Sequence, residues 1–367
     1  MSQTAAKTSR DDHWARRLLP WLFDAGFAPT LIVIIGIFMT FKSDVFLTSR
    51  NLQNILLQTS FLAIAAFGMT FIIIASELDL SMGSAIALVG VIAADVMVRN
   101  NSVLLGLLAG LAAGAAVGLF NGFVSAVLRV PSFITTLGML VMARGLAREI
   151  TSGNTVGGLP EHWSDFWATH ILGLRMAIWV AVAVGASFHV VLRYTRFGLR
   201  VYAVGGNAEA ARRAGINVTR VRLAVFLAGG IAIALAGFTV LGRVNSGQPN
   251  AAQLTELFAV AAVVLGGTNL FGGRGSIPRT VAGLILIGLL RNSLNLLRVS
   301  SNMQDVWLGL VFMLAMTSHL IRGYVVRWTS RLPNSTSTSA APETNPILPD
   351  PSVPSERSHD PIQKDAL

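Results

Sequence analysis

Long apolar runs alternate with short polar segments along most of the chain. The runs are about 17 to 25 residues long, which suits an α-helix that crosses about 30 Å of hydrocarbon. They are continuous rather than alternating in polarity, which disfavours a transmembrane β-barrel. The pattern predicts an all-α polytopic membrane protein with about ten transmembrane helices. They are expected at 27–41, 52–75, 82–98, 103–128, 133–150, 175–192, 221–243, 257–270, 278–297 and 304–321. The eighth run is short and the second is long, so nine or eleven helices also fit.

Polar segments flank this transmembrane domain, which is expected at 27–330. Residues 1–26 are predicted to be a cytoplasmic segment without a cleavable signal peptide. Residues 331–367 are rich in Pro, Ser and Thr, a composition that cannot build a core, and are predicted to be a disordered cytoplasmic tail. Within the domain, a soluble-looking basic block at 193–222 separates two sets of apolar runs.

Two similar turns indicate an internal duplication. Asp79-Leu-Ser-Met-Gly-Ser84 opens the apolar run 85–91, and Gly272-Gly-Arg-Gly-Ser-Ile277 opens the run 281–290. Interrupted segments in corresponding positions of two halves are typical of a transport path. The sequence therefore predicts two structurally related halves, although a chance match of two Gly-Ser turns would look the same.

Composition and charge fit this picture. The chain is 53% hydrophobic and 13% charged, with a net charge of +10. Such a charge would suggest nucleic acid in a soluble protein, but here the positive-inside rule explains it, so no nucleic-acid partner is expected. Lys and Arg are concentrated before the first span, at Arg129, in the basic block, and at Arg274 and Arg279. This bias predicts that both termini are cytoplasmic. The lipid bilayer is expected to surround the transmembrane helices.

Catalytic and metal motifs were not found in the sequence. There is no cysteine, and the six histidines have neither HxxxH nor HExxH spacing. The glycine-rich stretch Gly266–Ser276 lacks the lysine of a phosphate-binding loop. The chain is therefore expected to be no enzyme, to bind no metal and to hydrolyse no ATP itself.

Small and polar residues inside the apolar runs have two uses that the sequence alone leaves open. Glycines at 106, 110, 114, 118 and 122 form a smooth ridge for core packing, a gate or a dimer seam. Glu77 and Asp79 lie either within the membrane, where carboxylates are functional, or in the headgroup zone. The remaining polar groups either line a path or join helices. They are Asn121, Thr135, Thr136, Arg144, Glu149, Asn269, Asn292 and Asn295.

In loop 151–174, the aromatics Trp163, Phe166 and Trp167 suit the headgroup level or a docking surface.

The basic block contains a predicted two-turn helix at 208–214. Asn207 is a good N-cap, and Glu209, Arg212 and Arg213 lie at the ends of the helix that suit their charges. Gly215 suits a left-handed stop. A helix this short is unstable alone, so it has to dock. A groove on a cytoplasmic partner and an ordinary solvated basic loop both remain open.

The segment Glu209-Ala-Ala-Arg-Arg-Ala-Gly215 resembles the EAA-type loop of ATP-binding-cassette importer permeases, without the Ile and Leu-Pro that usually follow. The wider segment Gly205–Ile216 with Val221-Arg222 is closer to the ribose/xylose/arabinose permease family. Further matching pieces cover roughly residues 50 to 320 in the right order. They are Asp79-Leu-Ser81 with Gly83-Ser84, Asn121-Gly122, Arg129–Gly138 with Ala143–Leu146, and Leu265–Ser276. Ser76-Glu77-Leu78 departs from the family, which more often has glycines and an isoleucine there.

The resemblance implies a multi-pass protein of the bacterial inner membrane that moves a monosaccharide by alternating access. Its expected partners are a second permease copy, an ATPase subunit of double length that carries ATP and Mg, and a periplasmic sugar-binding protein. The expected ATPase-coupling residues are Gly205, Gly206, Asn207, Glu209, Ala210, Ala211, Arg212, Arg213, Gly215 and Ile216. The expected substrate path contains Asp79, Ser81, Asn121, Thr135, Thr136 and Asn269.

Two alternatives remain. A permease for branched-chain amino acids or nucleosides would have a similar architecture. An ion-coupled secondary transporter would need ionisable groups at the membrane midplane, for which Asp95 and His189 are the candidates.

Overall fold

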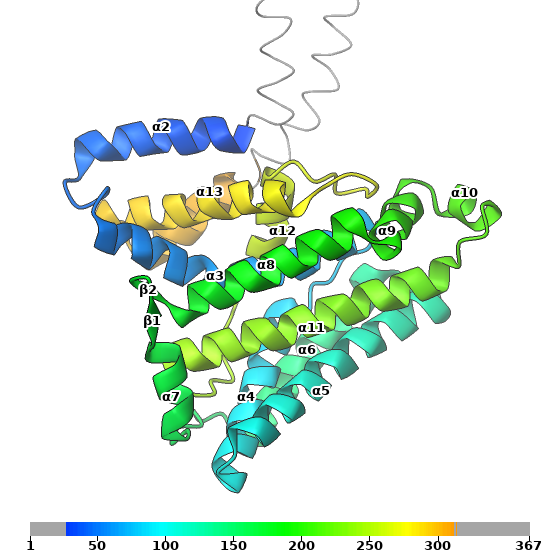
Figure 1. Cartoon of the computed structure of the whole chain (residues 1–367), viewed down its shortest axis with the longest axis horizontal. Helices are drawn as coiled ribbons and strands as arrows, with labels where there is room; N and C mark the ends of the chain where they lie inside the picture. Colours follow the sequence, from blue (N-terminus) through cyan, green and yellow to red (C-terminus); the bar gives the residue numbers. More distant parts are fainter. Residues whose placement is uncertain (1–26, 312, 314–367) are drawn as a thin grey trace, which may run out of the picture.

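The computed structural model describes residues 27–311 and 313 (Figure 1). The predicted segments 1–26 and 331–367, and the end of the tenth predicted span, lie outside the described residues. The membrane-domain helices are α2 (Phe27–Lys42), α3 (Ser49–Ile74), α4 (Met82–Asn100), α5 (Val103–Gly122) with its π-helical extension η1 (Phe123–Val127), α6 (Ser132–Thr151), α8 (Met176–Tyr194), α11 (Val218–Val244), α12 (Thr255–Leu265) and α13 (Ile277–Leu296). The connecting elements are α7 (Glu161–Ala168), β1 (His170–Ile171), β2 (Leu174–Arg175), α9 (Arg196–Gly206) and α10 (Ala208–Arg213), and residues 301–311 are helical.

Six of the described helices are long and apolar enough to cross a membrane. They are Ser49–Ile74, Met82–Asn100, Val103–Val127, Met176–Tyr194, Val218–Val244 and Ile277–Leu296. α6 has 20 residues but carries the three charges of Arg144, Arg148 and Glu149. α12 has only 11 residues, about 16 Å of helix, which is too short to cross alone. The multi-pass helical character is confirmed, whereas the number of ten spans and the two related halves stay predictions.

The core is built where α11 packs against α3, α4 and α5. The glycine ridge of α5 faces α11 over most of its length, so core packing is its use in this chain. A methyl group on Gly114 would meet the Gly230 carbonyl oxygen at 2.6 Å and Ala234 Cβ at 2.9 Å. Gly106, at the start of the ridge, instead meets Ala93 and Met97 of α4. Because the ridge is buried inside the protomer, it is not a dimer seam.

Buried polar side chains join α3 to α13. The amide nitrogen of Asn51 donates to Asn292 Oδ1 at 3.0 Å, and the Asn292 nitrogen donates to Asn51 Oδ1 at 2.7 Å. The hydroxyls of Thr70 and Thr280 are 2.8 Å apart on the same pair of helices. For Asn292 the structure therefore supports helix-to-helix hydrogen bonding rather than a place in a path.

The segment 151–174 is more ordered than the predicted loop. It contains α7, and β1 pairs with β2 in a short antiparallel hairpin, so the fold is not purely helical. Trp163 and Trp167 are 3% and 6% exposed. Trp167 lies directly over Gly242 of α11. These two tryptophans are core residues rather than interfacial or docking aromatics, whereas Phe166 is exposed.

Candidate coupling helix and interior polar cluster

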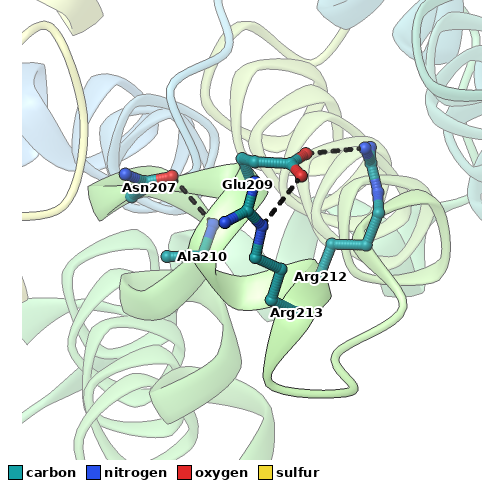
Figure 2. A network of polar contacts seen from close by, with 5 residues as sticks. All are labelled: Asn207, Glu209, Ala210, Arg212 and Arg213. Carbon is teal, nitrogen blue, oxygen red and sulfur yellow. Dashed lines mark hydrogen bonds and ion pairs between the residues drawn. The ribbon is translucent and has the colours of Figure 1, made fainter. Parts of the chain in front are cut away.

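The predicted helix of the basic block is present as α10, which lies with α9 at the opposite end of the molecule from α7 and the hairpin (Figure 1). Asn207 Oδ1 accepts a hydrogen bond from the Ala210 backbone N–H at 2.9 Å, as the predicted N-cap requires. Glu209 pairs with Arg212 at 3.0 Å and with Arg213 at 3.3 Å (Figure 2). These side chains are exposed, so each pair stabilises the helix by only about 0.3–0.5 kcal/mol.

The stop of α10 follows the sequence closely. The helix ends at Arg213, one residue earlier than predicted, and Gly215 has φ = +82°. Ala211 is only 5% exposed and packs within the core of its own chain. Although Ala211 is among the expected coupling residues, its side chain is not open to a partner in this conformation. Ala210 and Ala214 are exposed. The surface that α10 offers is thus Ala210 and Ala214 flanked by the Glu209–arginine pairs.

Just before α10, the chain passes through a close backbone contact that we call the glycine junction, formed by residues 74–76, 205–206 and 271–273. Gly273 N–H donates to the Ile74 carbonyl oxygen at 2.9 Å, and Ser76 Oγ donates to the Phe271 carbonyl oxygen at 3.0 Å. Gly205 is pressed so closely on the Ile74 carbonyl group that no Cβ fits. Gly205 is buried for packing and is therefore not a surface residue for a partner.

Four of the predicted path residues gather around the segment between α3 and α4. Asp79 Oδ1 accepts from Ser81 N–H at 2.8 Å and from Ser81 Oγ at 2.5 Å. Asn121 Nδ2 donates to Ser81 Oγ at 3.0 Å and to Asp79 Oδ2 at 3.5 Å. Thr136 Oγ1 accepts from the Leu80 N–H at 3.1 Å and donates to the Leu78 carbonyl oxygen at 3.4 Å. We call Asp79, Ser81, Asn121 and Thr136 the polar cluster.

The polar cluster is sealed in this conformation. Each of its four residues is fully buried, with 0% exposure. Burial raises the pKa of Asp79 above its ordinary value of 3.8, while the hydrogen bonds from Ser81 and Asn121 oppose the rise. Asp79 therefore holds the turn before α4 and is closed to solvent in this conformation.

The other two predicted path residues have hydrogen bonds of their own, outside the polar cluster. Thr135 Oγ1 donates to the Pro131 carbonyl oxygen of its own helix at 3.5 Å. Asn269 is exposed, and its Oδ1 accepts from the Phe271 N–H at 3.1 Å within the 266–276 turn. The six residues predicted for the path are therefore not joined in one hydrogen-bonded network, and their role in a path stays a prediction.

Arg144 and Glu256 are two further interior charges. The sequence left Arg144 open between lining a path and joining helices, and did not single out Glu256. Arg144 does not pair with Glu149; its guanidinium donates to the carbonyl oxygens of Pro249 and Ala251 at 2.7 and 2.9 Å. Glu256 is 9% exposed in the first turn of α12, and its carboxylate fills the space beside Gly83 where a Cβ would stand. A carboxylate opening a short apolar run was the only sequence signal for this contact.

No metal centre accompanies these groups: the described part of the chain has no three His, Asp or Glu side chains grouped as ligands. A multi-pass helical bundle with a capped helix at one end fits the membrane-spanning subunit of a transport system. The chain belongs to the family described as "Branched-chain amino acid transport system / permease component", which matches residues 51–316.

Similar proteins have been named for pentose uptake. The ribose import permease protein RbsC of Escherichia coli strain K12 is 40% identical over 299 residues, covering 80% of this chain and 93% of the relative. RbsC of Bacillus subtilis strain 168 is 40% identical and covers 77% and 89%. The L-arabinose transport system permease protein AraH of Escherichia coli strain K12 is 40% identical and covers 74% and 82%. No solved structure matches the chain.

Proposed function

We propose that this chain is the transmembrane permease subunit of an ATP-binding-cassette importer that moves a monosaccharide into the cytoplasm by alternating access. The observation that carries the proposal is α10, a capped helix held at one end of the bundle by a buried alanine while its charged face stays exposed. The names of the relatives, with about four-fifths of the chain covered, support a pentose-sized sugar.

In this proposal the ATP and Mg sites belong to a partner ATPase, for which we expect a double-length chain. Asn207, Glu209, Ala210, Arg212 and Arg213 would meet that subunit, since each is exposed at or beside α10. A periplasmic sugar-binding protein and a second copy of this chain complete the expected assembly. The inner membrane of a bacterium is its expected location.

A branched-chain amino acid permease is the alternative that the family description favours. The secondary-transporter alternative is weakened by the candidate charges. Asp95 pairs with Arg99 at 2.8 Å near the end of α4, and His189 packs edge-on against Tyr194 near the end of α8. Neither group stands alone at the middle of a helix, where a coupling ion or proton would need it.

Membrane orientation can be tested cleanly because the chain has no cysteine. We expect Glu209→Cys in α10 to be protected from a membrane-impermeant maleimide in intact cells, and Glu161→Cys in α7 to react. Both side chains lie on exposed positions of the protomer. The reverse labelling pattern would overturn the proposed orientation.

The function itself is tested by affinity purification of the tagged chain from its host in mild detergent, followed by uptake assays. A co-purifying double-length ATPase and uptake of a labelled pentose would support the proposal. Single-length ATPases with uptake of leucine would support the amino-acid alternative. Dimers that retain no ATPase would contradict both.

A further inference from the structure

Both ends of the segment that carries α10 are attached to one short stretch of chain between α3 and α4. On the N-terminal side, Gly205 rests on the Ile74 carbonyl group in the glycine junction. On the C-terminal side, Arg222 Nε of α11 lies 2.8 Å from Glu77 Oε1. The two attachments are three residues apart on the receiving stretch, so residues 74–77 contact both flanks of the helix.

The Glu77–Arg222 ion pair differs from the ion pairs within α10. The Glu77 side chain is 8% exposed and that of Arg222 is 28% exposed, whereas the Glu209 pairs are more than half exposed. An exposed pair is screened by water, but removing one partner of a buried pair leaves an uncompensated charge. Burial raises the pKa of Glu77 above its ordinary value of 4.5, and Ser132 and Arg222 oppose that rise.

The receiving stretch leads directly into the polar cluster. Glu77 is two residues from Asp79, and the Leu78 N–H donates to Ser132 Oγ at the start of α6 at 3.1 Å. The next residues are held by Thr136 and Asn121. If residues 74–77 move, the hydrogen bonds that close the polar cluster are therefore stretched or broken.

Two attachments act differently from one. The glycine junction ties only the N-terminal flank of the segment to the α3–α4 stretch, while α11 on the other flank packs against α3 itself. The Glu77–Arg222 ion pair ties this C-terminal flank to the same stretch, so a movement of the segment acts on residues 74–77 from both sides.

We propose that Glu77 and Arg222 are a positioning pair that makes residues 74–81 follow the movement of α10, so that docking events at α10 open or close the polar cluster. The inference rests on the proposed function. It assigns a role to Glu77, which lies where the resembling family more often has other residues.

The test uses the whole complex, purified with its ATPase and reconstituted in vesicles with the sugar-binding protein. The variants are Glu77→Gln, Arg222→Gln, the double variant of these two, and the charge-exchanged Glu77→Arg/Arg222→Glu. Asp95→Asn is the matched control, because Asp95 makes an ion pair of the same 2.8 Å length at the far end of α4. Sugar uptake and ATP hydrolysis are measured in the same vesicles.

We expect Glu77→Gln to retain the ATPase subunit and to hydrolyse ATP while uptake per ATP falls about tenfold, a typical coupling effect. The double glutamine variant should be no worse than either single variant, because both remove the same interaction. The charge-exchanged variant should recover uptake, and Asp95→Asn should match the wild type.

Wild-type uptake per ATP in Glu77→Gln would overturn the inference, as would additive defects in the double glutamine variant. A charge-exchanged variant that folds but transports no better than the single variants would also count against the pair. Failure of the wild-type chain to retain any ATPase would instead overturn the proposed function.

Discussion

The contact between α5 and α11 is so close that Gly118 has no room for a single methyl group. A Cβ at this position would overlap with the Phe226 carbonyl oxygen and would lie 3.0 Å from Gly230 Cα. Both atoms belong to the backbone of α11, so no side-chain rotation can relieve the clash. We therefore predict that Gly118→Ala destabilises the permease, although alanine is the better helix former.

The magnitude follows from two opposing effects. Replacing glycine by alanine in a helix favours folding by about 1 kcal/mol. Overpacking a rigid contact costs about 1–3 kcal/mol, and a backbone clash belongs at the upper end of that range. Separating the two helices would also weaken the dispersion contacts at Gly114 and Gly122, which meet α11 on the same ridge. The net loss is expected to be about 2 kcal/mol.

The assay is the apparent Tm in detergent, measured from the monodisperse fraction that survives heating. By the scaling of domains of this size, about 2 kcal/mol lowers Tm by roughly 5 °C. Gly36→Ala in α2 is the matched control, because a Cβ there meets nothing within 4 Å. We expect it to melt at or slightly above the wild-type temperature. An unchanged Tm for Gly118→Ala, or an equal fall for both variants, would refute the packing argument.

Three further predictions concern other contacts. Asn292→Leu should cost about 1–2 kcal/mol of stability because it leaves the buried Asn51 Oδ1 without its donor, while Asn51 Nδ2 keeps its bond to the Phe46 carbonyl oxygen. Asn51→Leu/Asn292→Leu should cost less than the sum of the single changes in the same heating assay. Ala211→Asp should abolish uptake, although the protein reaches the membrane in wild-type amount, because it buries a carboxylate under α10. Gly215→Pro should have the same effect, because proline cannot adopt φ = +82°. Normal uptake by both variants would contradict the coupling role. Gly242→Ala should lower Tm by several degrees, because its methyl group would overlap the Trp167 ring. A wild-type Tm would show that α7 can shift away from α11 at little cost in stability.

The sequence predicted best those features that are set by neighbours along the chain. Asn207 and Gly215 fixed the ends of α10 to within one residue, because a cap and a left-handed stop depend on local backbone geometry. The turn at Asp79 was predictable for the same reason: its carboxylate bonds the N–H and hydroxyl of Ser81, two residues on.

Contacts between distant segments could not be predicted in this way. The regular spacing of Gly114 and Gly118 predicted a smooth face on α5, but nothing in that spacing named α11 as its partner. Arg144 was compared with Glu149 because they are near in sequence, while its actual partners are carbonyl groups beyond residue 248. Trp163 and Trp167 were misplaced because aromatic rings suit the membrane interface and a core equally well, and only the fold of α7 against α11 decides between them.

The sealed polar cluster sets an energetic condition that the proposed mechanism must meet. Four hydrogen bonds hold Asn121 and Thr136 to the α3–α4 segment. At about 1 kcal/mol net for each bond, opening the cluster costs about 4 kcal/mol. Moving a two-state equilibrium from 1:99 to 99:1 takes about 5.5 kcal/mol of differential binding. The cluster is thus stable enough to stay closed in the absence of a partner. It is also weak enough to open when docking at α10 favours the other state, provided that the glycine junction and the Glu77–Arg222 pair transmit the movement.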